Sequence, residues 1–366
     1  MKAQFLYSLT IFLLTGLSAT SRQTLAPYQW KYHTTAQRLL QIEESYSKLT
    51  AEKKRAYYDP MYQTIDRLID AAKIRLAPYT QPGQAIDSAK AKLVLQTIDS
   101  VLTEQHFLVC IIVDRLSEAL TPKKLEQFSC YKYLPGYRRE FCERRPDSLY
   151  YGVDCDLGAM LYVSIGEVLN FPLKLIEVPA HNFVRWRFAD NSYLNFDNNT
   201  GLIYADDSFR NGQTATSSSR FSLAEEKACH FLQDMGEKEV RAYYLTIIGI
   251  FISHQGRYAE TEQLYKEAIA ARPYDVLAMN NLSWMYLTLS NFKKPAYYKE
   301  AYRLSKLVDQ LLPSSIEYKD TYSCACAGIG DFKKAGIVEK AARNKPKRLA
   351  GYHKRMTCLD IGETLW

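Results

Sequence analysis

The segment from Asp154 to Gly201 constrains the fold most strongly, because its residue pattern changes from helical to extended within a short stretch of chain. Apolar residues recur at helical spacing after Asp154, which is a favourable N-cap residue, and Asn170-Phe171-Pro172 provides a stop signal. The recurring apolar residues are Leu157, Leu161, Ile165 and Val168. We therefore expect a helix whose first turn contains Cys155.

Extended segments are expected directly after this helix. Residues 173–178 and 179–188 have the apolar and aromatic composition of strands. The sequence from 189 to 192 has turn chemistry, and the chain then returns along residues 193–197 until a second turn at 198–201. This order predicts a helix, a strand and a β-hairpin, which is an α+β arrangement.

Three residues along this pattern are the components of a nucleophilic cysteine site. Cys155 lies at the helix start, His181 on the second strand and Asp197 on the third. A thiol with an imidazole base and a carboxylate that orients the base can carry out acyl transfer. The free N–H groups and the dipole at a helix start favour thiolate and could hold an oxyanion. Asp154 and Asp156 oppose part of that effect, so we expect activation to depend on His181.

The position of Asp197 depends on the register of the hairpin. Direct opposition of His181 and Asp197 requires a loop centred on Ala189, which lies midway between them. A two-residue turn at Asp190-Asn191 would shift the register and direct Asp197 to the opposite face. The face on which Asp197 lies therefore depends on which of these turns the chain makes.

Each of the three residues also has a purely structural explanation. Cys155 could be a buried helix residue, His181 a strand histidine with satisfied hydrogen bonds, and Asp197 a turn residue. Their order along one helix and one hairpin favours a common site, either working or ancestral. Cys229-His230 is a rival thiol and imidazole pair, but adjacent helix residues point apart and the strand context is missing.

The segment resembles the transglutaminase-like superfamily, and within it the bacterial SirB-like branch. The resemblance covers residues 148–203 and rests on the following residues: Cys155 leading into Leu161-Tyr162, Leu169-Asn170-Phe171-Pro172, the run from Val178 to Arg185, and Phe196-Asp197 with Gly201. It implies a papain-like cysteine fold in which Cys155, His181 and Asp197 form a catalytic triad. Ala180 stands where the family often has glycine, and Asn198 where it often has proline. Many members of the branch lack the cysteine, which this chain retains.

The function that this resemblance implies is thiol-dependent acyl transfer on an amide or ester. Water as acceptor gives hydrolysis and an amine gives transamidation, and the sequence does not select between them. The alternative is a catalytically inactive member that acts as a binding or assembly scaffold. Neither needs a cofactor or a metal, and the sequence contains no phosphate loop, zinc-protease helix or dinucleotide fingerprint.

A helical pattern begins near residue 241 and recurs with a period of about 34 residues, which resembles tetratricopeptide repeats (TPR). In the first unit, which starts at 242, these residues fill consensus-like positions: Leu245, Ile248, Gly249, Gly256, Tyr258, Tyr265, Ala268 and Pro273. Further units start at 276 and at about 316. Repeats of this kind would follow the first domain as an α-helical solenoid.

The repeat resemblance implies a concave groove that binds a protein or peptide partner. The predicted lining residues are Tyr243, Thr246, Asn280, Trp284, Glu317 and Asp320. They do not form a basic carboxylate clamp, so no peptide class is implied. Packing within the repeats is the alternative explanation for Trp284 and the tyrosines.

The N-terminus has the pattern of a secretory signal peptide, with one early lysine, an apolar run and then small residues over 1–21. We therefore expect a secreted or periplasmic protein. An uncleaved anchor or a buried first helix is the alternative, and membrane association is expected only if the segment stays uncleaved.

The remaining divisions follow from composition. We expect a helical N-terminal region at 22–110 that packs on the core, and a transglutaminase-like core at 111–213. A connecting segment at 214–240 would follow, with an exposed loop at 214–220. The repeats span 241–350, and a C-terminal tail spans 351–366.

Overall composition excludes some partners. With 366 residues, 47% of them apolar, the chain is large enough for two cores. Its net charge of +7 is spread in short clusters, so nucleic acid is not implied. Among eight cysteines, Cys130 and Cys142 are the best disulfide candidates in an exported protein, with buried thiols as the alternative. Cys324 and Cys326 would diverge on a helix, which argues against a metal site there.

Overall fold

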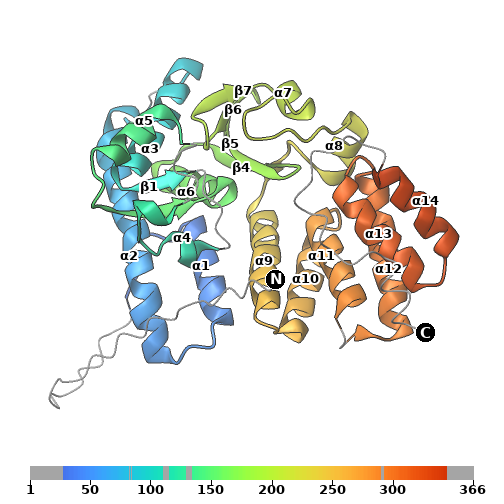
Figure 1. Ribbon diagram of the computed structural model, residues 1–366. Coiled ribbons are helices and arrows are strands. Elements are labelled where there is room, and N and C mark those ends of the chain that lie inside the picture. The colour runs from blue at the N-terminus through green and yellow to red at the C-terminus, as the bar shows by residue number, and fades with distance from the viewer. Residues whose placement is uncertain are drawn as a thin grey trace, which may run out of the picture.

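The computed structural model describes residues 28–81, 83, 85–109, 115–128, 134–289 and 292–343. The predicted signal peptide at 1–21 and the predicted tail at 351–366 lie outside these residues. The described chain is of mixed α+β class with helices predominating, which confirms the fold class at this level. Figure 1 shows helices on both sides of a small sheet.

The N-terminal part is a group of helices: α1 (Thr35–Tyr46), α2 (Ala51–Leu76), a short 3-10 turn η1 (Ala77–Tyr79) and α3 (Ser88–Glu104). The side chain of Gln37 accepts a hydrogen bond from the Thr34 backbone N–H at 3.0 Å, which caps the start of α1. The next backbone N–H groups reach another element, since that of Ala36 donates to Oγ of Ser164 at 2.9 Å. This hydrogen bond connects α1 to α6, the helix that begins with Cys155.

A three-stranded sheet leads into that helix. Its strands lie in the order β1, β3, β2, with β1 parallel and β2 antiparallel to β3. The elements here are β1 (Phe107–Val109), α4 (Leu116–Ala119), β2 (Lys123–Lys124), η2 (Leu125–Gln127), α5 (Gly136–Glu143), β3 (Leu149–Val153) and α6 (Cys155–Leu169). Because β3 ends one residue before Asp154, the sheet sets the position at which α6 starts.

The second sheet has five antiparallel strands in the order β7, β6, β5, β4, β8. Their bounds are β4 (Leu173–Val178), β5 (His181–Arg187), β6 (Tyr193–Asp197), β7 (Leu202–Tyr204) and β8 (Asp234–Met235). The predicted helix at 155 and the strands that follow it are confirmed. The strand β8 comes from the segment that the sequence analysis treats as a connection.

The hairpin between β5 and β6 has neither of the two turns considered from the sequence. Strands β5 and β6 pair Arg187 with Tyr193, so the loop is centred on Asp190 rather than Ala189. It is a three-residue loop whose last residue, Asn191, has a φ of +67°, a common hairpin geometry. Relative to the required register, the pairing moves by two residues and not by one. Since side chains alternate along a strand, Asp197 still lies on the same face of the sheet as His181.

The two faces of this sheet pack against different parts of the chain. On one face, Val184, Trp186 and Phe196 join a core that includes α6 and the N-terminal helices. On the other face, Ile176 and Phe183 pack in a second core with α7 (Asp206–Arg210) and α8 (Leu223–Cys229). His181 lies on the same face as Phe183, because they are two residues apart.

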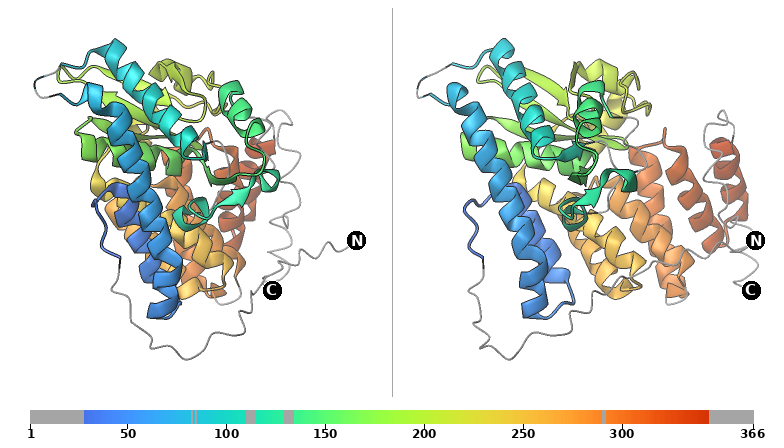
Figure 2. Two further views of the ribbon diagram at one scale, coloured as in Figure 1. Left: turned by 90° about the vertical axis from the view of Figure 1, so that its left-hand side faces the viewer. Right: turned by 60° about the vertical axis from the view of Figure 1, so that its left-hand side comes forward.

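The C-terminal half consists of helices that pack in consecutive pairs (Figures 1 and 2). They are α9 (Glu237–His254), α10 (Tyr258–Ala271), α11 (Val276–Thr288), α12 (Pro295–Leu311), α13 (Ile316–Gly328) and α14 (Phe332–Arg343). Within the first pair, a Cβ atom at Gly249 would lie 2.6 Å from the ring of Tyr265. Glycine at this position therefore permits the close approach of α9 and α10.

The helical pairs pack directly on the N-terminal half. The hydroxyl of Tyr244 on α9 accepts from the Leu116 backbone at 3.0 Å and donates to Glu43 at 3.1 Å. Buried Arg272, which follows α10, pairs with Glu177 of β4 and with Asp275 at 3.0 Å. The views in Figure 2 show the later pairs following one another away from α1 and α2.

The structure also bears on the expected disulfide and on possible membrane-spanning helices. Cys142 is an unpaired, buried thiol, so a disulfide between Cys130 and Cys142 is wrong; Cys130 lies outside the described residues. No helix among the described residues is long and apolar enough to cross a membrane.

Candidate active site

Cys155 is the first residue of α6, as predicted. Asp154 is the N-cap, and its Oδ1 accepts a hydrogen bond from the Leu157 backbone N–H at 3.3 Å. The same N–H group donates to Oδ1 of Asp156 at 2.8 Å. The helix ends at Asn170, whose φ of +58° places it in the left-handed region that favours asparagine and glycine. Local sequence therefore determines both ends of the helix that presents the thiol.

The environment of Cys155 favours the neutral thiol over thiolate. Burial raises the pKa of Cys155 well above its usual range, and the charges of Asp156 and Asp154 raise it further. The backbone N–H groups of Asn182 and Asp156 act in the opposite direction and do not compensate. The backbone donors at the helix start lower the pKa and the two aspartates raise it, as expected, but burial is the largest effect and raises the pKa overall.

Asp154 and Asp156 interact with each other beside the thiol. Burial raises the pKa of Asp154 well above its usual range, and the charge of Asp156 and a hydrogen bond to it act in the same direction. Tyr243 of α9 reaches this pair, since its hydroxyl lies 3.0 Å from Oδ2 of Asp156 and 3.1 Å from Oδ1 of Asn182.

His181 and Asp197 form a buried pair. Nε2 of His181 lies 3.3 Å from Oδ2 of Asp197, and their side chains are only 2% and 0% exposed. Burial alone would raise the pKa of Asp197, but the hydrogen bond and charge of His181, with bonds from Thr216 and the Asn199 backbone, hold it below its usual value. Phe209 packs parallel to the imidazole on the same face of the sheet. Asp197 is therefore an ionised partner for the imidazole.

Thr216 is a site residue that the sequence analysis missed. Its hydroxyl donates to Oδ2 of Asp197 and lies 3.1 Å from Nε2 of His181. The predicted exposed loop at 214–220 is wrong in part, since Thr214 and Ser217 are buried. A short run of small polar residues carries no spacing signal, so its composition predicted only a loop.

The structure thus brings His181 and Asp197 together, while the contacts of the Cys155 sulfur in the described part of the chain are to the backbone of its neighbours and not to the pair. The backbone N–H of Asn182, the residue after His181, points to the Cys155 sulfur. Among the residues that the structure describes, no hydrogen bond connects this sulfur to the imidazole, and none involves Nδ1 of His181.

The turn after Asp197 is held by groups from elsewhere in the chain. Nδ2 of Asn198 donates to the Cys155 carbonyl at 3.0 Å, which links the turn to the helix start. Buried Arg138 of α5 donates to the carbonyls of Asn198 and Asn199 at 2.7 and 3.0 Å, and forms an ion pair with Asp99 of α3. An isolated arginine without a motif offers no sequence signal for this role.

The rival pair at 229 and 230 does not form a site. The thiol of Cys229 donates to the Leu311 carbonyl at 3.4 Å, and burial raises its pKa to about 12. The ring of His230 instead stacks on Tyr274, with 3.8 Å between ring centroids. The two side chains therefore serve packing in separate contacts.

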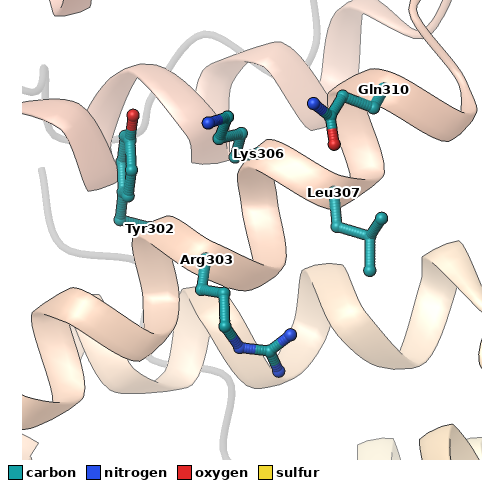
Figure 3. A pocket seen from close by; sticks show the side chains of 5 residues that line it. All are labelled: Tyr302, Arg303, Lys306, Leu307 and Gln310. Carbon is teal, nitrogen blue, oxygen red and sulfur yellow. The ribbon is translucent and has the colours of Figure 1, made fainter.

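Other parts of the described chain offer little for a ligand. No group of three or more His, Cys, Asp or Glu side chains in the described ranges could hold a metal ion. Figure 3 shows an open hollow on α12, which is separate from the elements that carry Cys155, His181 and Asp197. Its lining residues are Tyr302, Arg303, Lys306, Leu307 and Gln310.

The predicted groove residues are distributed between core and surface. Tyr243 and Thr246 are buried, and Tyr243 is used in the contact with Asp156, so neither lines an open groove. Asn280 and Trp284 are partly buried on α11. The last two predicted residues, Glu317 and Asp320, lie exposed on α13.

No protein-family model, curated protein or solved structure matches this chain.

Proposed function

We propose that this protein is a thiol-dependent acyl-transfer enzyme of the transglutaminase-like type, with Cys155 as nucleophile, His181 as base and Asp197 as the group that orients the base. The observation that carries the proposal is the buried pair of His181 and ionised Asp197. The next residue after His181, Asn182, directs its backbone N–H to the Cys155 sulfur. The resemblance of residues 148–203 to this superfamily supports the same assignment.

The proposed reaction starts from a neutral thiol. As the Cys155 sulfur attacks the carbonyl carbon of an amide or ester, its proton moves to Nδ1 of His181. The leaving amine or alcohol then takes that proton from His181 as the C–N or C–O bond breaks, which leaves a thioester on Cys155. Water or an amine attacks the thioester and gives its proton to His181, which returns that proton to the sulfur as the C–S bond breaks, so that Cys155 is again a neutral thiol.

Asp197 has an electrostatic role in this scheme. Its carboxylate stabilises the imidazolium that forms when His181 accepts the proton. The backbone N–H groups of Cys155 and Asp156 in the first turn of α6 are the proposed donors to the oxyanion of the tetrahedral intermediate, since that of Leu157 already donates to Asp154 and Asp156.

We also propose that helices α9 to α14 are TPR-type repeats that bind a protein or peptide partner of an exported protein. The consecutive helical pairs and the close approach at Gly249 support the repeat assignment. Because Tyr243 and Thr246 are buried, the proposed contact surface is restricted to the later helices, with exposed Glu317 and Asp320 on α13. Fractionation of expressing cells would test export.

A catalytically inactive scaffold is the second candidate, and specific observations favour it. The thiol is held neutral, and it makes no hydrogen bond to the imidazole among the described residues. Under this candidate, the buried polar residues around Cys155 serve only to pack α6 against β5 and α9.

Alkylation of Cys155 separates the two candidates. Iodoacetamide labelling is followed by mass spectrometry of the Cys155 peptide in wild type, His181→Ala and the matched control His230→Ala, with Cys155→Ala as the blank. An enzyme is expected to lose labelling rate in His181→Ala by roughly a hundredfold, the usual scale for a general base, and to keep it in His230→Ala. Equal rates in wild type and both histidine variants would leave the scaffold as the function.

A further inference from the structure

One hydroxyl contacts both members of the buried histidine and aspartate pair. Oγ1 of Thr216 donates to Oδ2 of Asp197 and lies 3.1 Å from Nε2 of His181. The direct separation of Nε2 and Oδ2 is 3.3 Å, which is longer than the usual range for an N–H···O bond. Thr216 is therefore the nearer hydrogen-bond partner of the imidazole.

The protons available determine the direction of these bonds. An ionised carboxylate only accepts hydrogen bonds, so the single hydroxyl proton of Thr216 is used in the bond to Asp197. The hydroxyl can then offer His181 only a lone pair, and Nε2 must carry the ring proton. In the neutral ring this leaves Nδ1 unprotonated.

The loop after α7 has specific geometry that places this hydroxyl. Oγ1 of Thr214 accepts from the Ser217 backbone N–H at 2.9 Å, and both side chains are buried. Gly212 has a φ of +60°, and a Cβ atom there would lie 2.5 Å from the carbonyl oxygen of Ser218. Only glycine permits the loop to fold back this closely.

We propose that Thr216 is a positioning residue. Its hydroxyl bridges the Asp197 carboxylate and Nε2 of His181, and so holds the imidazole in the tautomer protonated on Nε2. The proposal rests on the proposed function, in which the free Nδ1 accepts the Cys155 proton. Thr216 acts through the imidazole and takes no part in bond making or breaking.

The tautomer of His181 is the direct test. The ¹⁵N chemical shifts of the two ring nitrogens distinguish N–H from a bare nitrogen, and the His181 signals are assigned by their loss in His181→Ala. At a pH where the ring is neutral, wild type and Thr216→Ser are expected to carry the proton on Nε2. Thr216→Val, which keeps the shape without the hydroxyl, is expected to show both tautomers. A tautomer in Thr216→Val that equals wild type would overturn the proposal.

A kinetic measurement complements the spectrum. Thr216→Val is expected to slow Cys155 alkylation about tenfold, the factor that one hydrogen bond of ~1.4 kcal/mol corresponds to, with Thr216→Ser close to wild type. A loss in Thr216→Ser as large as in Thr216→Val would contradict the proposal, since serine keeps the hydroxyl. Thr216→Ala replaces the valine variant if that variant does not fold.

The two proposals fail in different ways. If the Cys155 labelling rate is unchanged in His181→Ala, the proposed enzymatic function is wrong, while the ¹⁵N spectrum still reports on Thr216. If the labelling rate depends on His181 but the His181 tautomer is unchanged in Thr216→Val, the enzymatic function stands and the positioning role of Thr216 is wrong.

Discussion

At the scale of single residues, Asp197 links the ionisation of the site to the stability of the fold. Burial would raise its pKa, but His181, Thr216 and the Asn199 backbone hold the pKa below its usual value. A group with a lowered pKa in the folded state stabilises the protein above its unfolded pKa, about 3.9 for aspartate, and this contribution disappears as the pH falls through the folded pKa.

We therefore predict a pH-dependent effect of Asp197→Asn. Near neutral pH the variant is expected to lower the free energy of unfolding by about 1–3 kcal/mol, because a buried charged acceptor is lost. The difference from wild type should begin to shrink as the pH falls below about 3.9, the unfolded pKa, and should disappear as the pH falls through the lower folded pKa of Asp197. Urea unfolding at several pH values measures it. A difference that is constant with pH would contradict the role of Asp197 as an ionised group.

Arg138 gives a second prediction at this scale. It is buried, pairs with Asp99 and donates to the turn after Asp197, so Arg138→Met leaves a buried carboxylate without its cation. We expect a loss of about 3–5 kcal/mol in the free energy of unfolding. The neighbouring variant Arg139→Met is the matched control, since Arg139 is half exposed and should cost less than about 0.5 kcal/mol. If urea unfolding gave similar losses in free energy of unfolding for Arg138→Met and Arg139→Met, the structural role of Arg138 would be contradicted.

Residue types alone could predict only part of the site. Cys155, His181 and Asp197 could be proposed from the sequence because each lies on an element with a clear periodicity, and their residue types have specific chemistry. Thr216 and Arg138 act through contacts between segments distant in sequence, and neither side chain lies in a recognisable motif. The raised pKa of Cys155 could not be predicted, because burial by the whole fold, which outweighs the helix start, cannot be read from local sequence.

At the scale of elements, helix ends and strand bounds followed from local chemistry, whereas hairpin register did not. Capping by Asp154 and the left-handed Asn170 correspond to the start and stop signals of α6. For β5 and β6, a one-residue change in loop length separates alternative pairings, and the loop at Asp190 uses a left-handed Asn191 that composition does not single out. The face of Asp197 was preserved because the shift was even.

The turn between β4 and β5 offers a prediction for an element. Ala180, directly before His181, has a φ of +60°, a conformation that costs a residue with a Cβ atom about 1 kcal/mol or more. Ala180→Gly is therefore expected to raise the free energy of unfolding by roughly 0.5–1 kcal/mol. Ala56→Gly in α2 is the control of opposite sign, because it is expected to lower the free energy of unfolding by about 1 kcal/mol. Destabilisation by Ala180→Gly in thermal unfolding would show that the turn is not strained.

At the scale of the whole molecule, the sheet and the helical pairs are joined by buried polar contacts as well as by apolar packing. Tyr243 of α9 contacts Asp156 beside the thiol, and Arg272 pairs with Glu177 on β4. The sequence predicted separate domains because helical and strand patterns occupy different stretches of chain. Side-chain contacts across such a boundary have no periodicity, so the junction was visible only in the structure.

The pair of Arg272 and Glu177 gives the test of this junction. Burial raises the pKa of Glu177 while Arg272 lowers it; the Arg272 side chain is 3% exposed and that of Glu177 is 16% exposed. Arg272→Met alone leaves Glu177 and Asp275 without their shared cation, and we expect it to cost about 3–5 kcal/mol in the free energy of unfolding.

A double-mutant cycle isolates the contact between sheet and helices. Once Glu177 is replaced by glutamine, Arg272→Met removes a cation from one carboxylate rather than two, so its cost should fall by about 1–3 kcal/mol. Urea unfolding of wild type, both single variants and the double variant supplies the four free energies. If the losses in free energy of unfolding of the two single variants add up to that of the double variant within about 0.5 kcal/mol, Arg272 stabilises only its own loop, through Asp275. Coupling of the expected size would show that the helical pairs help to hold the strand that leads, through Ala180, to His181.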